Sequence, residues 1–463
     1  MQILAKRLFL LLTLLPSLII IRQFFTPKTD YGIYLDYTGA GRFTENQLNR
    51  AHELITDRLY CNPHSQSICS QNSEEMINLV KNKVLDLFNV TSDEYSVIFT
   101  SGATGALKIV ADSFAWNNNS KFVYLTDNHN SVIGIKHVAK RFGASVNSVT
   151  QEQVEFKGSA FLANPDKPAL FAYPAQSNFH GRKYPLSWLK DENKNKLSFE
   201  GIDRDYKWYT LLDAAAFVPS SRLSLKEYPA DFVPVSFYKI FGYPTGLGAL
   251  LVRKSAQDVI HKCYRGGGSI TVTSCNEGCD FTLDKPDFEE AYQDGTVAFL
   301  SIIELLAGFE EMEKLGWENV YQNVKDMRTR AFNQVVSLTH STGQRFLEIY
   351  GSCDPAQQGG ILSFNVYKEN GEFHGPVEIS SLAAKSNIHI RAGMQCNLGA
   401  FLNDALIPIE KVRDGFYART SCGDANDMID NHPLGAVRVS FGAYTTAKEV
   451  DFFVNWLKEN YLK

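Results

Sequence analysis

The sequence predicts an α/β fold with a mainly parallel sheet, helices on both faces of that sheet, and a smaller α+β part. Between about residues 72 and 300, strand-like apolar runs alternate with helix-like segments, which is the order that a parallel sheet with crossover helices requires. The chain has 463 residues, 44% of them hydrophobic, so it can bury a large core. After about residue 310 it has helix and strand signals of its own, including a strand-like run at 360–366. One large or two coupled α/β domains are therefore expected.

Domain organisation follows from these signals. We expect a larger part at about 61–305 and a smaller part made of 31–60 with 306–463, with the functional site in the cleft between them. Residues 1–30 stand apart, because they contain an apolar run of 14 residues at 8–21. A membrane span needs about 20 residues, and no clean small-residue cleavage site of a signal peptide follows this run. A short anchor that gives membrane association and a signal-like or wrongly assigned start both stay open.

An amphipathic helix is the first element that the sequence marks clearly. Its apolar face is formed by Met76, Ile77, Val80, Val84, Leu87 and Phe88. Asn72 and Glu75 have the spacing of a capping box, so we expect the helix to begin near Asn72.

The next signal is a strand that leads through a glycine-containing turn into a helix. Residues 96–100 read as a buried strand, and the sequence Ser-Gly-Ala-Thr-Gly follows at 101–105 before a helical apolar pattern. Free backbone N–H groups at the start of that helix, together with the Thr104 hydroxyl, would bind a phosphate group. An ordinary turn between a strand and a helix has the same features, so this segment alone leaves both readings open.

Asp213 and Lys239 each follow a strand-like run. Residues 208–212 lead into Asp213, and Lys239 comes soon after residues 231–235 and just before a glycine-containing turn. Burial of a lysine at such a position lowers its pKa, and the neutral amine can then form a Schiff base. A carboxylate at the same sheet edge would hold the ring nitrogen of pyridoxal phosphate protonated. A solvated lysine and a turn aspartate are the ordinary alternatives, and only the combination with a phosphate site favours a pyridoxal phosphate enzyme.

Nine sequence motifs extend this interpretation along the chain. They lie at 34–41, 62–65, 97–104, 126–132, 173–179, 232–248, 293–297, 391–397 and 437–442. With these motifs the chain resembles the class V aminotransferase-like enzymes of fold type I. Among them it is most similar to cysteine desulfurases and to the amino-terminal desulfurase part of molybdenum cofactor sulfurases. The resemblance implies one class V aminotransferase-like domain over residues 31–463.

The resemblance implies roles for residues around the cofactor, pyridoxal 5′-phosphate. Lys239 matches the Schiff-base lysine, Asp213 the partner of the pyridine nitrogen, and His129 the imidazole that stacks on the ring and relays protons. The other matching positions are Ala103, Thr104 and Ser236 at the phosphate, Asn178 at the phenolic oxygen, and Thr296 at the phosphate of a second subunit. The position of Thr296 implies a homodimer whose active sites contain residues of both subunits.

The resemblance also implies a substrate-binding pair and a sulfur carrier. Arg438 and Arg391 match the guanidinium groups that bind the substrate carboxylate, a task that suits the planar fork of arginine. Cys396, five residues after Arg391, matches the cysteine that forms the persulfide, and a nearby arginine would lower the pKa of its thiol. Surface ion pairs and a structural cysteine are the ordinary alternatives. Ala216 and Tyr238 depart from many desulfurases but resemble the molybdenum cofactor sulfurases.

The implied activity is that of a pyridoxal phosphate-dependent L-cysteine desulfurase. It would form alanine and an enzyme persulfide and donate the sulfur to molybdenum cofactor or to a carrier of that cofactor. The chain ends soon after a helix-like segment at 449–461, and none of it is assigned to molybdopterin binding. The alternatives are a general desulfurase or selenocysteine lyase with another acceptor, and a non-catalytic membrane-tethered relative.

Composition narrows the partners and the compartment. A net charge of −5 without a basic stripe argues against nucleic acid as a partner. The eight cysteines are scattered, and persulfide chemistry needs reducing conditions, so we expect a cytoplasmic catalytic domain, with or without the amino-terminal anchor. His261, Cys263, Cys275 and Cys279 could form a zinc or cluster site, but their spacing is loose and no metal is expected.

Overall fold

The structure, a computed structural model, describes residues 32–156, 163–194, 196–202, 205–276, 278–404, 407–418, 424 and 426–463. The apolar run at 8–21, with the membrane association predicted for it, lies outside these ranges. Among the helices within them, none is both long enough and apolar enough to cross a membrane.

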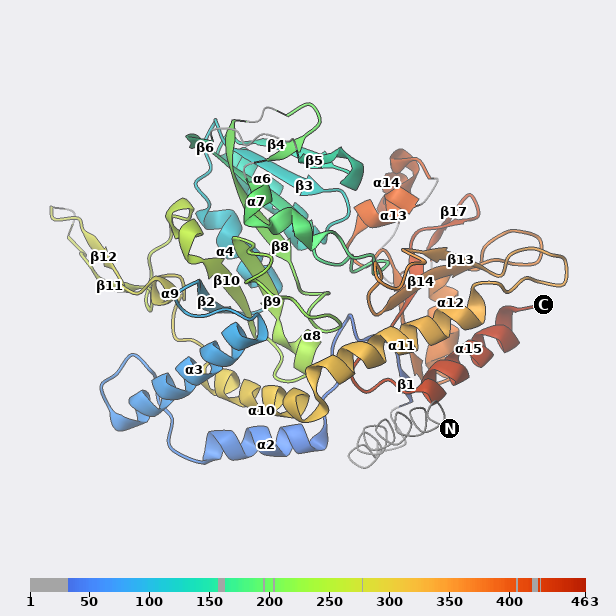
Figure 1. The fold of residues 1–463 in the computed structure, drawn as a ribbon, viewed down its shortest axis with the longest axis horizontal. Helices are drawn as coiled ribbons and strands as arrows, with labels where there is room; N and C mark the ends of the chain where they lie inside the picture. The colour runs from blue at the N-terminus through green and yellow to red at the C-terminus, as the bar shows by residue number, and fades with distance from the viewer. Residues whose placement is uncertain are drawn as a thin grey trace, which may run out of the picture.

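The larger part is built on a seven-stranded sheet (Figure 1). In spatial order its strands are β2 (Tyr95–Thr100), β10 (Gly248–Arg253), β9 (Phe232–Ser236), β8 (Tyr206–Asp213), β6 (Asn164–Pro174), β3 (Lys121–Leu125) and β4 (Ser145–Val149). β10 runs antiparallel to its two neighbours, whereas the other adjacent strands are parallel. The predicted mainly parallel sheet is therefore confirmed, and the strands predicted at 96–100, 208–212 and 231–235 are β2, β8 and β9.

Helices cover both faces of this sheet. Val97 and Phe99 of β2 pack in one core cluster and Ile98 packs in another, because successive side chains of a strand point to opposite faces. The helices that supply these clusters are α3 (Ile68–Leu87) and α10 (Phe299–Leu315) on the first face, and α4 (Ala103–Ser113) and α6 (Ile135–Arg141) on the second. Burial on both faces explains why the strands read as continuous apolar runs.

α3 begins earlier than predicted. Its N-cap is Ser67, so Asn72 lies inside the helix, where its side chain donates to the Leu59 carbonyl at 3.1 Å. Glu75 forms an exposed ion pair with Arg58 at 3.1 Å. The capping box predicted from Asn72 and Glu75 is therefore wrong. The spacing of these two residues in the sequence does not reveal that the helix already begins before them.

The smaller part contains a four-stranded antiparallel sheet, drawn in orange and red in Figure 1. In spatial order its strands are β13 (Leu347–Tyr350), β14 (Ile361–Val366), β19 (Ala436–Ser440) and β16 (Arg391–Gly393). The helices that pack in the same core are α11 (Trp317–Val335), α12 (Pro376–Lys385) and α15 (Ala447–Tyr461). The predicted strand at 360–366 and the predicted helix at 449–461 correspond to β14 and α15.

The chain before residue 61 packs with both parts. β1 (Ile33–Tyr34) pairs in parallel with β15 (Ile388–His389), and Leu35 lies in the core of the smaller part. α2 (Glu45–Thr56) packs against α10, and its Ala51 and Leu54 belong to a core of the larger part. The domain boundaries predicted from the sequence stay a prediction.

Shorter elements complete the described chain. They are α5 (Asn130–Ile133), β5 (Val154–Phe156), α7 (Asp191–Lys194), β7 (Leu197–Phe199), α8 (Phe237–Phe241), β11 (Ile270–Thr273), β12 (Thr282–Asp284), α9 (Phe288–Ala291), α13 (Leu398–Asp404), α14 (Ile409–Tyr417), β17 (Met428–Ile429), β18 (His432–Pro433), and 3-10 turns at Gln151–Gln153, Leu186–Leu189 and Lys254–Val259. β11 and β12 form a hairpin that projects from the larger part (Figure 1).

The structure pairs two of the cysteines that are scattered along the sequence. Cys61 and Cys69, which flank the start of α3, are joined by a disulfide with Cα atoms 5.1 Å apart. In the part of the chain that the structure describes, no group of three or more His, Cys, Asp or Glu side chains is placed to hold a metal ion.

Gly248, the first residue of β10, allows the start of α4 to approach the sheet closely. A Cβ atom at this position would lie 2.3 Å from the carbonyl oxygen of Val235 and 2.5 Å from the Cα of Gly102. Both neighbours are backbone atoms, so they cannot rotate away.

We expect Gly248→Ala to lower the free energy of unfolding by about 2 kcal/mol or more, because backbone must shift to admit the methyl group. Urea denaturation followed by circular dichroism measures this difference. Gly267→Ala is the matched control, since a Cβ atom there meets nothing within 4 Å. Equal stability of the two variants would show that the close approach is not required.

Candidate active site

The two parts of the chain enclose a cavity of about 460 Å³. The predicted site residues that line it are His129, Asn178, Lys239, Arg391, Cys396 and Arg438. Lys239 comes from α8, just after β9, whereas the two arginines come from β16 and β19 of the smaller sheet. The cavity therefore brings together predicted site residues that are up to 309 positions apart in sequence, from His129 to Arg438.

Lys239 is held in the environment that a nucleophilic amine needs. Burial lowers the pKa of Lys239, and the carboxylate of Asp213 only partly opposes that effect. Asp213 ends β8, is nearly buried, and accepts a hydrogen bond from the Ala215 N–H at 3.0 Å. A lowered pKa increases the fraction of neutral amine, which is the form that attacks a carbonyl carbon.

His129 caps the first turn of α5 with its ring. Its Nδ1 accepts the Ser131 N–H at 3.1 Å, so the proton of the neutral ring is on Nε2. Burial lowers the pKa of His129, and the nearby charge of Asp213 raises it less. The imidazole is therefore neutral near pH 7 and presents an N–H donor.

The start of α4 has the arrangement of an anion-binding turn. The Ala103 N–H, the first of the helix, donates to the Ser236 hydroxyl at 2.8 Å, and the Thr104 and Ser131 hydroxyls are 2.9 Å apart. Gly102 precedes the helix with φ +133°, a backbone conformation that residues other than glycine rarely adopt. Ala103, Thr104 and Ser236, predicted separately from the sequence, thus lie around one helix N-terminus, where N–H groups favour phosphate.

The two arginines share one carboxylate that the sequence analysis did not single out. Asp36 accepts from Arg438 at 2.9 Å through one oxygen and from Arg391 at 2.7 Å through the other. Arg438 is buried and also donates to the Asn178 carbonyl at 2.8 Å, while its Nε has no hydrogen-bond partner among the described residues. Two cations against one anion leave a net positive charge, which suits a ligand carboxylate.

Cys396 is exposed and lies on a segment held by several hydrogen bonds. The Asn130 N–H donates to the Cys396 carbonyl at 2.8 Å, and the Asn178 side chain donates to the Gln395 carbonyl at 2.6 Å. Gln395 and Cys396 both have positive φ, 56° and 55°. This backbone conformation is strained for residues other than glycine, and the two hydrogen bonds help to hold the segment in it.

Gly399 lies three residues after Cys396, where the chain packs against the end of β3. A Cβ atom there would lie 1.7 Å from the Thr126 carbonyl oxygen, so Gly399 allows close packing. Gly393 has φ +112° and open space around it.

Asp127 is a second residue that sequence reasoning missed. Its buried carboxylate accepts from Asn397 at 2.6 Å, from Tyr184 at 2.7 Å and from Ser177 at 2.9 Å. Asn397 also donates to the Asn178 side chain at 2.9 Å, which joins the Cys396 segment to the Asn178 loop. Asp127 and Asp36 both lie in motifs that the sequence analysis recognised, so motif membership was the available signal.

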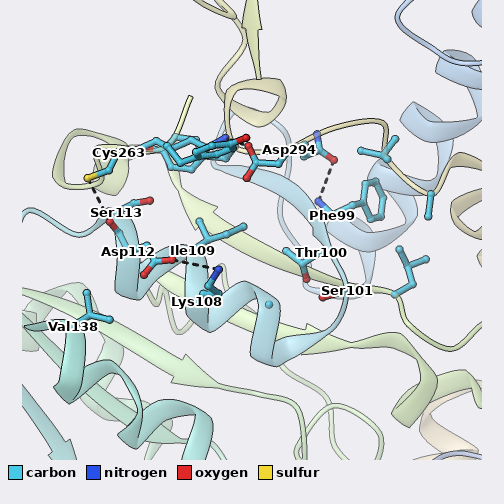
Figure 2. Close-up of a pocket in the computed structure, with 18 of the residues that line it drawn as sticks. Phe99, Thr100, Ser101, Lys108, Ile109, Asp112, Ser113, Val138, Cys263 and Asp294 are labelled. Carbon is cyan, nitrogen blue, oxygen red and sulfur yellow. Dashed lines mark hydrogen bonds and ion pairs between the residues drawn. The ribbon is translucent and has the colours of Figure 1, made fainter. Parts of the chain in front are cut away.

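Thr296 does not line the cavity of Lys239. It accepts a hydrogen bond from Asn62 at 3.3 Å and lines a separate, larger cavity of about 840 Å³. Figure 2 shows this cavity, with Thr100 at the end of β2 and Ser101 in the turn before α4. Lys108 lies in α4, where it forms an ion pair with Asp112 at 3.7 Å. Thr296 and Lys239 are thus separated within one chain.

Comparisons with known proteins identify the family of the chain. The pattern of the aminotransferase class-V family matches residues 33–453. Molybdenum cofactor sulfurase of Homo sapiens is 39% identical over 440 residues, which cover 92% of this chain and 49% of that protein. Molybdenum cofactor sulfurase of Danio rerio is 39% identical over 442 residues, covering 92% of this chain and 53% of that protein. The chain spans about half the length of these curated relatives.

Solved structures share the fold. A cysteine desulfurase from Thermococcus onnurineus NA1 has a TM-score of 0.72 at 20% identity, covering 94% of this chain and 95% of that chain. A cysteine desulfurase from Escherichia coli has a TM-score of 0.69 at 18% identity, covering 95% of this chain and 98% of that chain. These likenesses confirm the predicted fold class. Because the family pattern matches most of the sequence, the chain belongs to the aminotransferase class-V family.

Proposed function

We propose that the chain is a pyridoxal phosphate-dependent L-cysteine desulfurase that forms alanine and an enzyme persulfide. The observation that carries this proposal is the single cavity lined by Lys239, Cys396 and the arginine pair. A nucleophilic amine, a thiol and a carboxylate-binding pair are the three groups that this reaction requires of the protein.

The residues fit pyridoxal 5′-phosphate. Lys239 would hold the cofactor covalently, Asp213 would pair with its ring nitrogen, and the start of α4 with Ser236 would hold its phosphate. His129 would lie against the ring, and Asn178 beside the phenolic oxygen. When bound, the cofactor stabilises negative charge on the α-carbon of the substrate.

The chain's own residues then account for substrate binding and sulfur transfer. Arg438 and Arg391 would bind the carboxylate of L-cysteine, and the buried Nε of Arg438 is free among the described residues to donate to it. The Cys396 thiolate attacks the substrate sulfur, so an S–S bond forms while the C–S bond breaks. The carbon keeps the electron pair of the broken bond and takes up a proton, equivalent to the one that the Cys396 thiol lost, which yields alanine. The substrate sulfur stays on Cys396 as the outer sulfur of the persulfide. His129, neutral with its proton on Nε2, is placed to move protons in this cavity.

Molybdenum cofactor, free or on a carrier, is the proposed sulfur acceptor. The support is sequence similarity over 92% of this chain to molybdenum cofactor sulfurases. We also propose that the catalytic chain is divided into a larger part at about 61–305 and a smaller part made of 31–60 with 306–463. The cavity is lined from both, which supports that division.

A homodimer is proposed as the active form. Its support is the position of Thr296, which lines a cavity beside Ser101 and Gly105 at the start of α4 but is apart from the Lys239 cavity of the same chain. In a dimer, Thr296 of one subunit would complete the phosphate site of its partner.

The first variant tests the cofactor site. Lys239→Ala should fold but lose the visible absorbance of bound cofactor and release no alanine from L-cysteine, because the Schiff-base amine is gone. Lys254→Ala, at an exposed lysine, is the control. Alanine release at the parent rate by Lys239→Ala would remove Lys239 from the reaction.

The second variant tests the sulfur carrier. Cys396→Ser should bind cofactor and L-cysteine like the parent but carry no added sulfur, because an alcohol cannot form a persulfide. Mass spectrometry of the peptide around residue 396 measures the extra sulfur. Cys353→Ser, which also removes an exposed free thiol, should leave it unchanged. Extra sulfur found on Cys353 or Cys422 of the parent, with none on Cys396, would show that Cys396 is not the sulfur carrier.

The third test concerns sharing of sites between subunits. Thr296→Ala should weaken cofactor binding by roughly tenfold, the loss of one hydrogen bond to a charged group. Mixed dimers of Thr296→Ala with Lys239→Ala should recover one site of parent affinity, because one site then has both residues intact. Cofactor titration followed by absorbance measures this recovery. The proposal would be contradicted if the parent protein sediments as a monomer and is fully active. It would also be contradicted if the mixed dimers bind cofactor no more tightly than Thr296→Ala alone.

A further inference from the structure

A third cavity, of about 290 Å³, has no role in the proposed reaction. It lies between the turn at 217–222 and one face of α11, and residues 355–360 form its third wall. A cavity of this size is at the lower end of the range of small-molecule sites, about 300–1,000 Å³.

Its charged lining is strongly biased toward cations. Lys183, Arg222 and Lys325 line the cavity, and Glu318 is the carboxylate among its lining residues. Arg222 and Glu318 are 3.5 Å apart, and both side chains are mostly exposed, so this ion pair is weak. Within the described ranges, Lys183 and Lys325 form no ion pair.

Lys183 is the informative member of this group. It is only partly exposed, and its Nζ lies 5.6 Å from the centroid of the Phe217 ring. Burial lowers the pKa of Lys183, and the charge of Lys325 lowers it further. The charge that acts on Lys183 is thus that of another cation. Repulsion between the two ammonium groups lowers the stability of the fold unless an anion lies between them.

Neutral donors complete the wall. The Ser221 side chain is nearly buried, and its Oγ has no hydrogen-bond partner in the described part of the chain. Burial raises the pKa of Tyr321, so its hydroxyl keeps its proton. Two ammonium groups and hydroxyl groups are the donor set that recognises a phosphate group.

We infer that this cavity binds a small phosphate-bearing anion, either inorganic phosphate or a phosphomonoester, through Lys183 and Lys325. The site is distinct from the α4 phosphate site and does not depend on the desulfurase proposal. It lies near the active site, because Ser220, which lines it, donates to the side chain of Gln176 at 3.3 Å. Gln176 and Ser220 also line a small hollow that Lys239 lines.

Calorimetric titration of the cofactor-loaded protein tests this inference. Inorganic phosphate and glycerol 3-phosphate are the two probes, each titrated against a chloride background of equal ionic strength. One saturable site is expected, with affinity reduced at least about tenfold in Lys183→Met and in Lys325→Met, which remove charge and keep chain length. Lys385→Met, at an exposed lysine of α12, is the matched control and should bind like the parent.

The outcomes separate the two ligand sources and the failure of the inference. Tighter binding of glycerol 3-phosphate indicates a phosphomonoester, and equal binding of both probes indicates recognition of the phosphate group itself. Lys325 is exposed, so Lys325→Met keeps the test valid if Lys183→Met does not fold. No saturable binding by the parent, or equal affinity in Lys325→Met and Lys385→Met, would overturn the inference.

Discussion

The buried guanidinium of Arg438 is the group on which the candidate site depends most. Removing such a charge from water costs several kcal/mol unless partners compensate for it. Asp36 and the carbonyl of Asn178 supply those partners at 2.9 and 2.8 Å. Asp36 follows β1, Asn178 follows β6, and Arg438 lies in the smaller sheet. Neutralising one charge therefore fixes three distant segments relative to one another, and Asn178 and Arg438 both line the cavity.

Asp127 is a second buried charge that anchors residues around the cavity. Its carboxylate accepts from Ser177, Tyr184 and Asn397, so the Cys396 segment and the Asn178 loop are held by one buried anion. Positive φ at Gln395 and Cys396 is tolerated because these hydrogen bonds over-determine the backbone. The segment that presents the exposed Cys396 thiol is thus held in place through its backbone.

Burial and charge divide the lysines of this chain into different chemical roles. Lys239 has a lowered pKa with Asp213 nearby, an arrangement that favours nucleophilic chemistry. Lys183 has a lowered pKa with Lys325 nearby, an arrangement that favours an anionic ligand. Gln176 and Ser220 lie between the two regions and contact each other. The same physical effect, desolvation of an ammonium group, therefore has two consequences that depend on the sign of the neighbouring charge.

The sequence by itself determined the strands, the order of the elements and the positions of Lys239 soon after β9 and of Asp213 at the end of β8. These are local properties, because burial on both faces of a parallel sheet is written directly into continuous apolar runs. Family motifs added Cys396 and the arginines as candidates, whose roles stay predictions. Only the tertiary structure showed that Asp36 joins two arginines more than 350 residues away, that Gly399 packs against Thr126, and that Cys61 pairs with Cys69. It also showed that α3 begins at Ile68 and that Lys183 and Lys325 line the same cavity. Such facts depend on which segments meet in space, and neither periodicity nor spacing along the chain encodes that.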